Sequence, residues 1–139
     1  MRRIIVATHG KLAEGFMTSI KLIGGNTSNM VFLNAYVENT NIDEDIKEIM
    51  KMPVDEEIIV CTDLLGGSIN QKFIPYLGRE NFYLVTGINL AFVLGLSMYD
   101  GEISKSLLEK MIEECKEQMI LENDYFKNES SNESFFERG

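Results

Sequence analysis

The only histidine of the chain lies where a strand is predicted to end and a helix to begin, a place where side chains often contact a ligand. His9 directly follows an apolar run, residues 4–8, and precedes Gly10, after which the spacing of apolar residues changes to a helical period. In open α/β sheets, ligands bind beyond the carboxyl ends of the strands. A lone histidine is more often an ordinary surface or core residue, but its place at this edge favours a nucleophile or a base.

Asp63 could orient that imidazole. It follows residues 57–62, whose continuously apolar centre is typical of a parallel strand covered on both faces. If the strands that end at His9 and Asp63 are neighbours, the carboxylate can accept the Nδ1–H of the imidazole. That hydrogen bond fixes the tautomer and leaves Nε2 free to react. The alternative is that Asp63 is a turn residue or a helix N-cap.

Gly66, Gly67 and Ser68 could bind a tetrahedral anion. Two glycines at a helix start allow backbone N–H groups to face a ligand, the helix dipole adds positive potential, and the Ser68 hydroxyl is a further donor. Gly-Gly-Ser is also a common loop sequence, so this interpretation depends on the neighbouring His9 and Asp63. Further residues that could line the pocket are Thr8, Gly10, Leu65 and Asn89.

Other chemistries known for such sheets lack essential residues here. No P-loop lysine follows Gly66-Gly67 and GxGxxG is absent, which disfavours sites for nucleoside triphosphates and dinucleotides. A receiver domain would have paired acids where the chain has Thr8-His9, and a low-molecular-weight phosphatase would have arginine at position 67. One histidine and two distant cysteines provide no zinc ligand set. We therefore predict neither a metal nor a cofactor.

The elements that must position these residues alternate along the chain. The predicted strands are 4–8, 30–37, 57–62 and 82–86, and the predicted helices are 11–23, 42–50, 68–77, 90–98 and a longer one capped by Ser104. In that last helix we expect Leu107, Leu108, Met111, Ile112, Cys115 and Met119 to face inward. The alternation predicts an α/β fold, with a doubly wound, mostly parallel sheet of four strands in the order 2-1-3-4 and helices on both faces. A fifth, C-terminal strand is left open.

Length and composition fit one cytoplasmic domain. A chain of 139 residues buries about two thirds of its unfolded surface. The net charge of −9 disfavours binding to nucleic acid or to a membrane surface. Cys61 and Cys115 form no disulfide framework, and no apolar run approaches about 18 residues. We assign residues 1–121 to the domain and 122–139 to a polar tail, which is either flexible or docks on a partner subunit as a strand or peptide.

The segments described above resemble one protein family. They are Ile4-Ile5-Val6-Ala7-Thr8-His9-Gly10 with Ala13-Glu14-Gly15, then Thr62-Asp63-Leu64-Leu65-Gly66-Gly67-Ser68, and more loosely Thr86-Gly87-Ile88-Asn89-Leu90. Over about residues 1–120 the chain is similar to the EIIA component of the mannose family of the bacterial phosphoenolpyruvate-dependent sugar phosphotransferase system (PTS).

This resemblance implies a phosphotransferase that works as a carrier. His9 would receive a phosphoryl group from phospho-HPr and pass it to an EIIB component, which phosphorylates sugar at a membrane permease. Asp63 would orient the imidazole, and the loop of Gly66, Gly67 and Ser68 would hold the phosphoryl oxygens. Members usually form homodimers, often with an exchanged C-terminal strand, and need no metal or nucleotide. The membrane would be met only through the permease.

The chain departs from the family pattern in two places. Ile69-Asn70 follows Ser68, where many members have proline, which alters the first helical turn but keeps the donors. No clear strand follows the last predicted helix, which argues against strand exchange more than against a dimer. Because no EIIB-like segment is attached, we expect the acceptor to be a separate chain.

Two other functions stay open. A phosphotransfer subunit of a phosphoenolpyruvate-dependent dihydroxyacetone kinase uses the same kind of histidine but passes the phosphoryl group to a nucleotide on its partner. A regulator would bind a partner according to its phosphorylation state without transfer to sugar. The acceptor distinguishes these functions, and the sequence does not specify a sugar.

Overall fold

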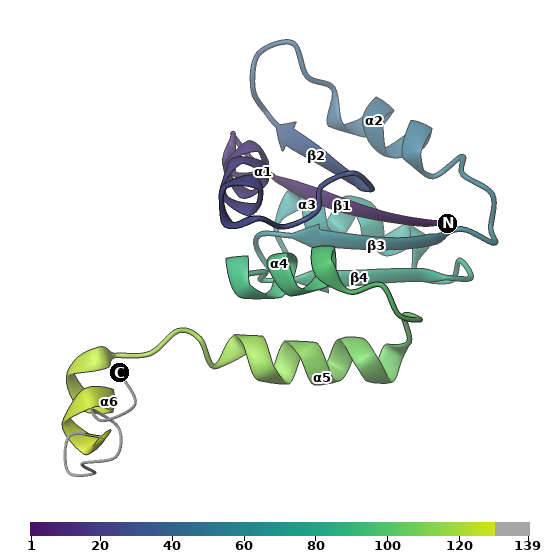
Figure 1. Ribbon diagram of the computed structural model, residues 1–139. Helices are drawn as coiled ribbons and strands as arrows, with labels where there is room; N and C mark the ends of the chain where they lie inside the picture. The colour runs from purple at the N-terminus through teal and green to yellow at the C-terminus, as the bar shows by residue number, and fades with distance from the viewer. Residues whose placement is uncertain (130–139) are drawn as a thin grey trace.

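The computed structural model describes residues 1–129 (Figure 1). Its centre is a sheet of four parallel strands, β1 (Arg2–His9), β2 (Met30–Ala35), β3 (Glu57–Thr62) and β4 (Phe82–Thr86). The strand order is β2-β1-β3-β4. The predicted fold class and strand order are thus confirmed, and all four strands present their carboxyl ends at one edge.

Helices cover both faces of this sheet, and of those in residues 1–129 only the last one lies away from it (Figure 1). They are α1 (Leu12–Ile23), α2 (Ile42–Ile49), α3 (Ser68–Phe73) with a 3-10 turn (Ile74–Tyr76), α4 (Leu90–Met98), α5 (Lys105–Lys116) and α6 (Glu122–Glu129). Because successive side chains of a strand point to opposite faces, β1 contributes Ile4 and Val6 to one core and Ile5 and Ala7 to the other. The first core contains residues of α1, α4 and α5, and the second contains residues of α2 and α3.

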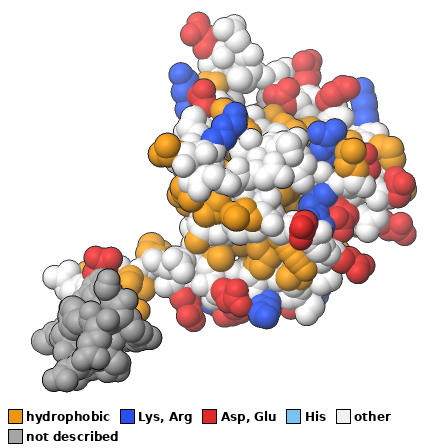
Figure 2. All heavy atoms as spheres, in the orientation of Figure 1, with side chains coloured by type: hydrophobic (Ala, Val, Ile, Leu, Met, Phe, Trp, Pro, Cys, Tyr) orange, Lys and Arg blue, Asp and Glu red, His pale blue; other side chains and the backbone are white. Residues whose placement is uncertain are grey.

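Hydrophobic side chains reach the surface over α4 and between α4 and α5, whereas acidic side chains lie around them (Figure 2). In the same region, a groove of about 500 Å³ separates the edge strand β4 from α5, and Tyr83, Leu108 and Ile112 are among its lining residues. The outer edge of β4 has no neighbouring strand among residues 1–129. No helix in this part of the chain is long and apolar enough to cross a membrane.

Several predicted boundaries were wrong, each for a local reason. The second strand ends at Ala35 rather than at residue 37, because Tyr36 has a left-handed backbone with φ 63°. The helix predicted to reach residue 77 is regular only to Phe73, since Pro75 lacks an N–H and a 3-10 turn replaces the last turn.

The C-terminal prediction also needs correction. Helix α5 ends at Lys116, so Met119 lies beyond it and is 91% exposed instead of facing inward. Residues 122–129 of the polar tail form α6, which lies beyond α5 and away from the sheet (Figure 1). Whether the tail is flexible or docks on a partner stays a prediction. No fifth strand occurs up to residue 129, and the rest of the tail, with Phe135 and Phe136, lies outside the described residues.

Candidate functional site

His9 and Asp63 meet at the carboxyl edge of the sheet. Strands β1 and β3 are adjacent and parallel, with Ala7 opposite Thr62, so that His9, two residues after Ala7, and Asp63, one residue after Thr62, reach the same edge of the sheet. Nδ1 of His9 lies 3.0 Å from Asp63 Oδ2 and 3.2 Å from Oδ1. The backbone N–H of His9 also donates to Oδ2, at 2.9 Å. Asp63 therefore holds His9 through both its imidazole ring and its backbone N–H.

The surroundings of Asp63 keep its carboxylate charged. Burial by itself raises the pKa of this carboxyl group, but hydrogen bonds from the backbone and ring of His9 and from backbone next to Asp63 outweigh it, and the pKa is lowered from the ordinary 3.8. An ionised carboxylate can only accept hydrogen bonds. Nδ1 must therefore carry the proton that it shares with Asp63, and in the neutral imidazole the lone pair is then on Nε2.

The loop after β3 approaches the imidazole closely. A Cβ placed on Gly67 would lie 3.3 Å from His9 Cε1 and 3.2 Å from the carbonyl oxygen of Leu64, closer than side chains normally come. Gly66 has φ 74°, a left-handed conformation that glycine adopts most easily. Ser68 then begins α3, and its Oγ lies 3.4 Å from His9 Nε2. The two glycines thus allow the Ser68 hydroxyl to reach the free ring nitrogen.

The N–H groups of the two glycines already have protein acceptors. Gly66 donates to Asn70 Oδ1 at 3.0 Å, and Gly67 donates to the carbonyl of Leu64 at 3.1 Å. In this arrangement the glycines shape the loop, and the donor next to Nε2 is the hydroxyl of Ser68. A phosphate-binding role for the glycine N–H groups stays a prediction.

Asn70 anchors the loop, a role that the sequence analysis missed. Its side chain is almost fully buried, accepts the Gly66 N–H and donates from Nδ2 to Thr86 Oγ1 at 2.9 Å. Thr86 in turn hydrogen-bonds the hydroxyl of Thr62. The loop is thereby tied to the ends of β3 and β4. The sequence signal that could have indicated this role is an asparagine next to the apolar residues of a helix face that is expected to be buried.

Tyr36 is the second residue that the sequence analysis missed. Its ring lies beside the His9 ring, with centroids 5.7 Å apart, and its hydroxyl is 2.8 Å from Ser68 Oγ. Tyr36 directly follows Ala35, the residue paired with His9 across β1 and β2. Considering the residue after β2 together with those after β1 and β3 would have placed it at the site.

The remaining predicted pocket residues are used differently. Thr8 is fully buried, and its Oγ1 accepts the N–H of Ala13 in α1. Gly10 forms the turn after β1 with φ 60°, and its N–H donates to Ala35. Leu65 is 84% exposed in the loop, where a docking protein could contact it. None of these side chains is hydrogen-bonded to the His9 ring.

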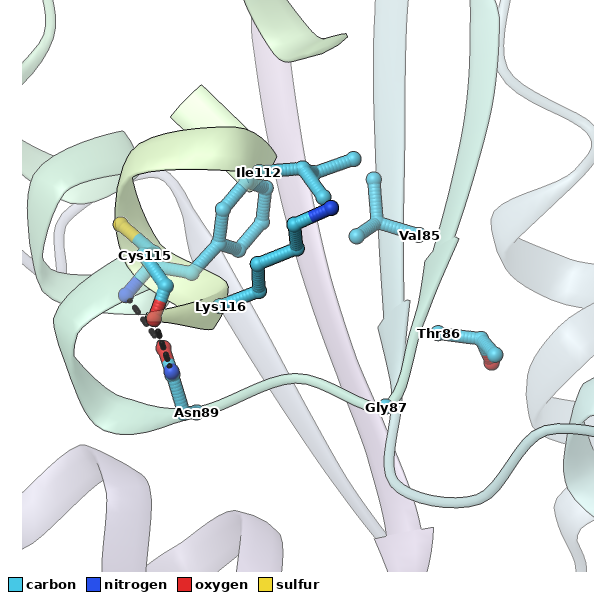
Figure 3. Close-up of a pocket in the computed structure, with 8 residues that line it drawn as sticks. Val85, Thr86, Gly87, Asn89, Ile112, Cys115 and Lys116 are labelled. Atoms are coloured by element: carbon cyan, nitrogen blue, oxygen red, sulfur yellow. Dashed lines mark hydrogen bonds between the residues drawn. The ribbon is translucent and has the colours of Figure 1, made fainter. Parts of the chain in front are cut away.

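Asn89 lines a separate small pocket instead. Its Oδ1 accepts the N–H of Phe92, which caps α4, and its Nδ2 donates to the carbonyl of Cys115 at 2.7 Å (Figure 3). This cavity of about 40 Å³ lies between the end of β4 and α5, with Lys116 at its rim. His9 does not line it. Asn89 therefore ties α4 to α5.

Within residues 1–129, no group of histidine, cysteine and acidic side chains is arranged to hold a metal ion.

Comparisons with known proteins show the family of the chain. The model of the family described as "PTS system fructose IIA component" matches residues 3–118. The chain belongs to this EIIA family. EIIA proteins are components of sugar phosphotransferase systems, so the chain has a phosphotransferase role of that general kind. A search of curated proteins found no match.

Solved structures support the same assignment. One is described as a phosphoenolpyruvate-dependent sugar PTS permease protein from Klebsiella pneumoniae, with 30% identity, a TM-score of 0.82 and coverage of 90% of this EIIA chain and 93% of that one. Another is a PTS IIA protein associated with the fucose utilization operon of Streptococcus pneumoniae, with 28% identity, a TM-score of 0.70 and coverage of 90% and 96%. A mannose/sorbose-specific IIA subunit from Enterococcus faecalis, 20% identical with a TM-score of 0.71 over 86% and 93% of the chains, shares the fold.

Proposed function

We propose that the protein is a phosphohistidine carrier, which accepts a phosphoryl group from phospho-HPr on Nε2 of His9 and passes it to a separate EIIB component. The observation that carries this proposal is the contact of 3.0 Å between Nδ1 and Asp63. Because that contact occupies Nδ1, the nitrogen left to attack phosphorus is Nε2, beside the Ser68 hydroxyl. The family assignment supports phosphotransfer in general, and the contact between Nδ1 and Asp63 favours Nε2 as the nucleophile.

The transfer needs neither a metal nor a nucleotide in this proposal. The Nε2 lone pair forms an N–P bond as the bond between phosphorus and the imidazole of the donor breaks, and the donor nitrogen keeps that electron pair. The His9 ring then carries positive charge while Nδ1 keeps its proton, and the carboxylate of Asp63 stabilises both. Ser68 can donate to a phosphoryl oxygen. Catalysis would come from placement and from donors oriented in advance.

The surface near His9 suits a docking protein. Leu64 and Leu65, in the loop after β3, are 60% and 84% exposed, and Tyr36, directly after β2, is 57% exposed, so that large apolar side chains gather at the same edge of the sheet. A groove of about 300 Å³ between α1 and α4 has Leu12, Phe16 and Leu90 among its lining residues. We propose that HPr and EIIB bind this apolar edge in turn, in the cytoplasm, where both partners would meet the carrier.

We also propose a homodimer. Within residues 1–129 no strand pairs with the outer edge of β4, and a second copy could cover this edge and the groove between β4 and α5. Light scattering of the purified protein at micromolar concentration tests this part separately. A monomer would contradict the dimer without touching the carrier function.

The deciding experiment is intact mass spectrometry after incubation with phosphoenolpyruvate, enzyme I and HPr. We expect wild type to gain one acid-labile phosphoryl group and His9→Ala to gain none. NMR of the phosphorylated protein should place phosphorus on Nε2. A folded wild-type protein that gains nothing would contradict the carrier function, and a phosphorylated His9→Ala variant would show that the nucleophile is wrong. Discharge by an EIIB protein, rather than by a nucleotide-loaded dihydroxyacetone kinase, then identifies the acceptor.

A further inference from the structure

Tyr36 connects the end of β2 to the reactive nitrogen of His9. Its hydroxyl is 2.8 Å from Ser68 Oγ, and Ser68 Oγ is 3.4 Å from Nε2. We propose that Tyr36 is a positioning residue for phosphoryl transfer, which acts on His9 through the hydroxyl of Ser68. This inference rests on the carrier function proposed above and adds to it the residue that directly follows β2, a strand to whose end no site residue had been assigned.

The charge of Asp63 determines the direction of each hydrogen bond in this chain. Since Asp63 only accepts, Nδ1 donates to it, and in the neutral imidazole, which is the nucleophilic form, Nε2 has the lone pair. The Ser68 hydroxyl must then donate to Nε2, and its single proton is used there. The Tyr36 hydroxyl is left to donate to Ser68 Oγ. A serine hydroxyl rotates freely unless a partner restricts it, so Tyr36 keeps the Ser68 proton directed at the ring.

The backbone at Tyr36 supports a specific role. Its φ of 63° lies in the left-handed region, which is unfavourable for a bulky non-glycine side chain. Such conformations persist where surrounding contacts hold them, and they are concentrated at functional sites. Here the contacts are the hydroxyl of Ser68 and the ring of His9. With this backbone conformation, β2 ends before Tyr36, and the aromatic ring lies at the site instead of in the sheet.

The arrangement also suits the phosphorylated state. Once the Nε2 lone pair forms the N–P bond, the Ser68 proton loses that acceptor and can turn to a phosphoryl oxygen. The Tyr36 hydroxyl can continue to donate to Ser68 Oγ during this change. Tyr36 would therefore restrict the same hydroxyl before and after transfer.

The test is a double-mutant cycle with a matched control. Tyr36→Phe removes the hydroxyl and keeps the ring, so we expect kcat for phosphorylation by phospho-HPr to fall about 3- to 10-fold with KM unchanged. In a Ser68→Ala background, Tyr36→Phe should have no further effect. Tyr76→Phe, which removes a hydroxyl from a ring packed near Phe82, is the control and should behave as wild type. Effects of Tyr36→Phe and Ser68→Ala that simply multiply would overturn the proposal.

A second readout does not depend on phosphotransfer. In the unphosphorylated protein, the ¹⁵N chemical shift of His9 Nε2 should move in the same direction in Tyr36→Phe and Ser68→Ala, and stay unchanged in Tyr76→Phe. If wild type takes up no phosphoryl group, the carrier function is wrong, whereas the shift still tests the contact through Ser68. An Nε2 shift that is identical in wild type and Tyr36→Phe would overturn the positioning role in either case.

Discussion

The backbone N–H of His9 and the ring Nδ1 of the same residue contact a single oxygen, Oδ2 of Asp63, at 2.9 and 3.0 Å. One carboxylate thus fixes the end of β1 and the orientation of the imidazole that follows it. The Leu64 N–H donates to the other oxygen at 3.1 Å, which holds the carboxylate itself in place. The position and tautomer of the His9 ring and the charge beside it therefore all depend on the Asp63 carboxylate.

Replacing Asp63 by asparagine should disable transfer while the fold is kept. The amide has nearly the same shape, but it cannot stabilise the positive charge that the His9 ring gains on phosphorylation. By analogy with carboxylate–histidine pairs in other enzymes, we expect the transfer rate to fall roughly 10²- to 10⁴-fold. Rapid-quench measurement of phosphohistidine formation checks this value. Asp55→Asn, at an exposed turn before β3, is the matched control. Equal rates for Asp63→Asn and wild type would exclude an electrostatic role.

Acid should weaken the fold through Asp63. Because its pKa is lower in the folded protein than the ordinary 3.8, this group stabilises the fold fully above that value, and the contribution is lost as pH falls through the lowered folded pKa. The difference in unfolding free energy between wild type and Asp63→Asn should shrink as pH is lowered below about 4. Urea titrations at a series of pH values measure it. A difference that is constant or grows in acid would contradict the assignment.

Gly67 is expected to tolerate no side chain. Its φ of −66° is ordinary, so alanine would not strain the backbone there. The added Cβ would instead press on His9 Cε1 and on the Leu64 carbonyl, and either the ring or the loop must move. Because small displacements of reacting groups are costly, we expect at least a tenfold loss of the phosphorylation rate. Gly78→Ala, where a Cβ meets open space, should be silent. Full activity of Gly67→Ala would show that the loop can relax.

Two asparagines that join separate elements should separate stability from activity. Asn70→Ala removes three hydrogen bonds and Asn89→Ala removes two, and each should lower the free energy of unfolding by about 1–3 kcal/mol. Only Asn70 anchors the loop beside His9, so only Asn70→Ala should slow phosphorylation in the folded protein. Thermal denaturation and initial rates, measured on the same samples, make the comparison. Slow transfer in folded Asn89→Ala would show that Asn89 does contribute to the site around His9.

The fold and the central pair were accessible because they follow from local rules. A strand or helix that buries part of its surface repeats apolar residues at its own spacing, and these spacings predicted the order of strands and helices. Parallel strands end at one edge, so residues that directly follow strands, such as His9 and Asp63, are brought together by topology. Element ends were wrong where Tyr36 and Pro75 interrupt the pattern, and Met119 was wrongly expected to face inward because α5 ends before it.

The side-chain contacts around Nε2 were decided only in three dimensions. Whether Tyr36 reaches Ser68 depends on the register of β1 with β2 and on one left-handed residue, and neither leaves a period in the sequence. The N–H groups of Gly66 and Gly67 likewise found acceptors through the buried Asn70 and a tight turn. The sequence by itself determined which residues gather at the edge, because strand ends are set by burial. Tertiary structure decided which atoms remain free to react, because that depends on which hydrogen bonds are already made.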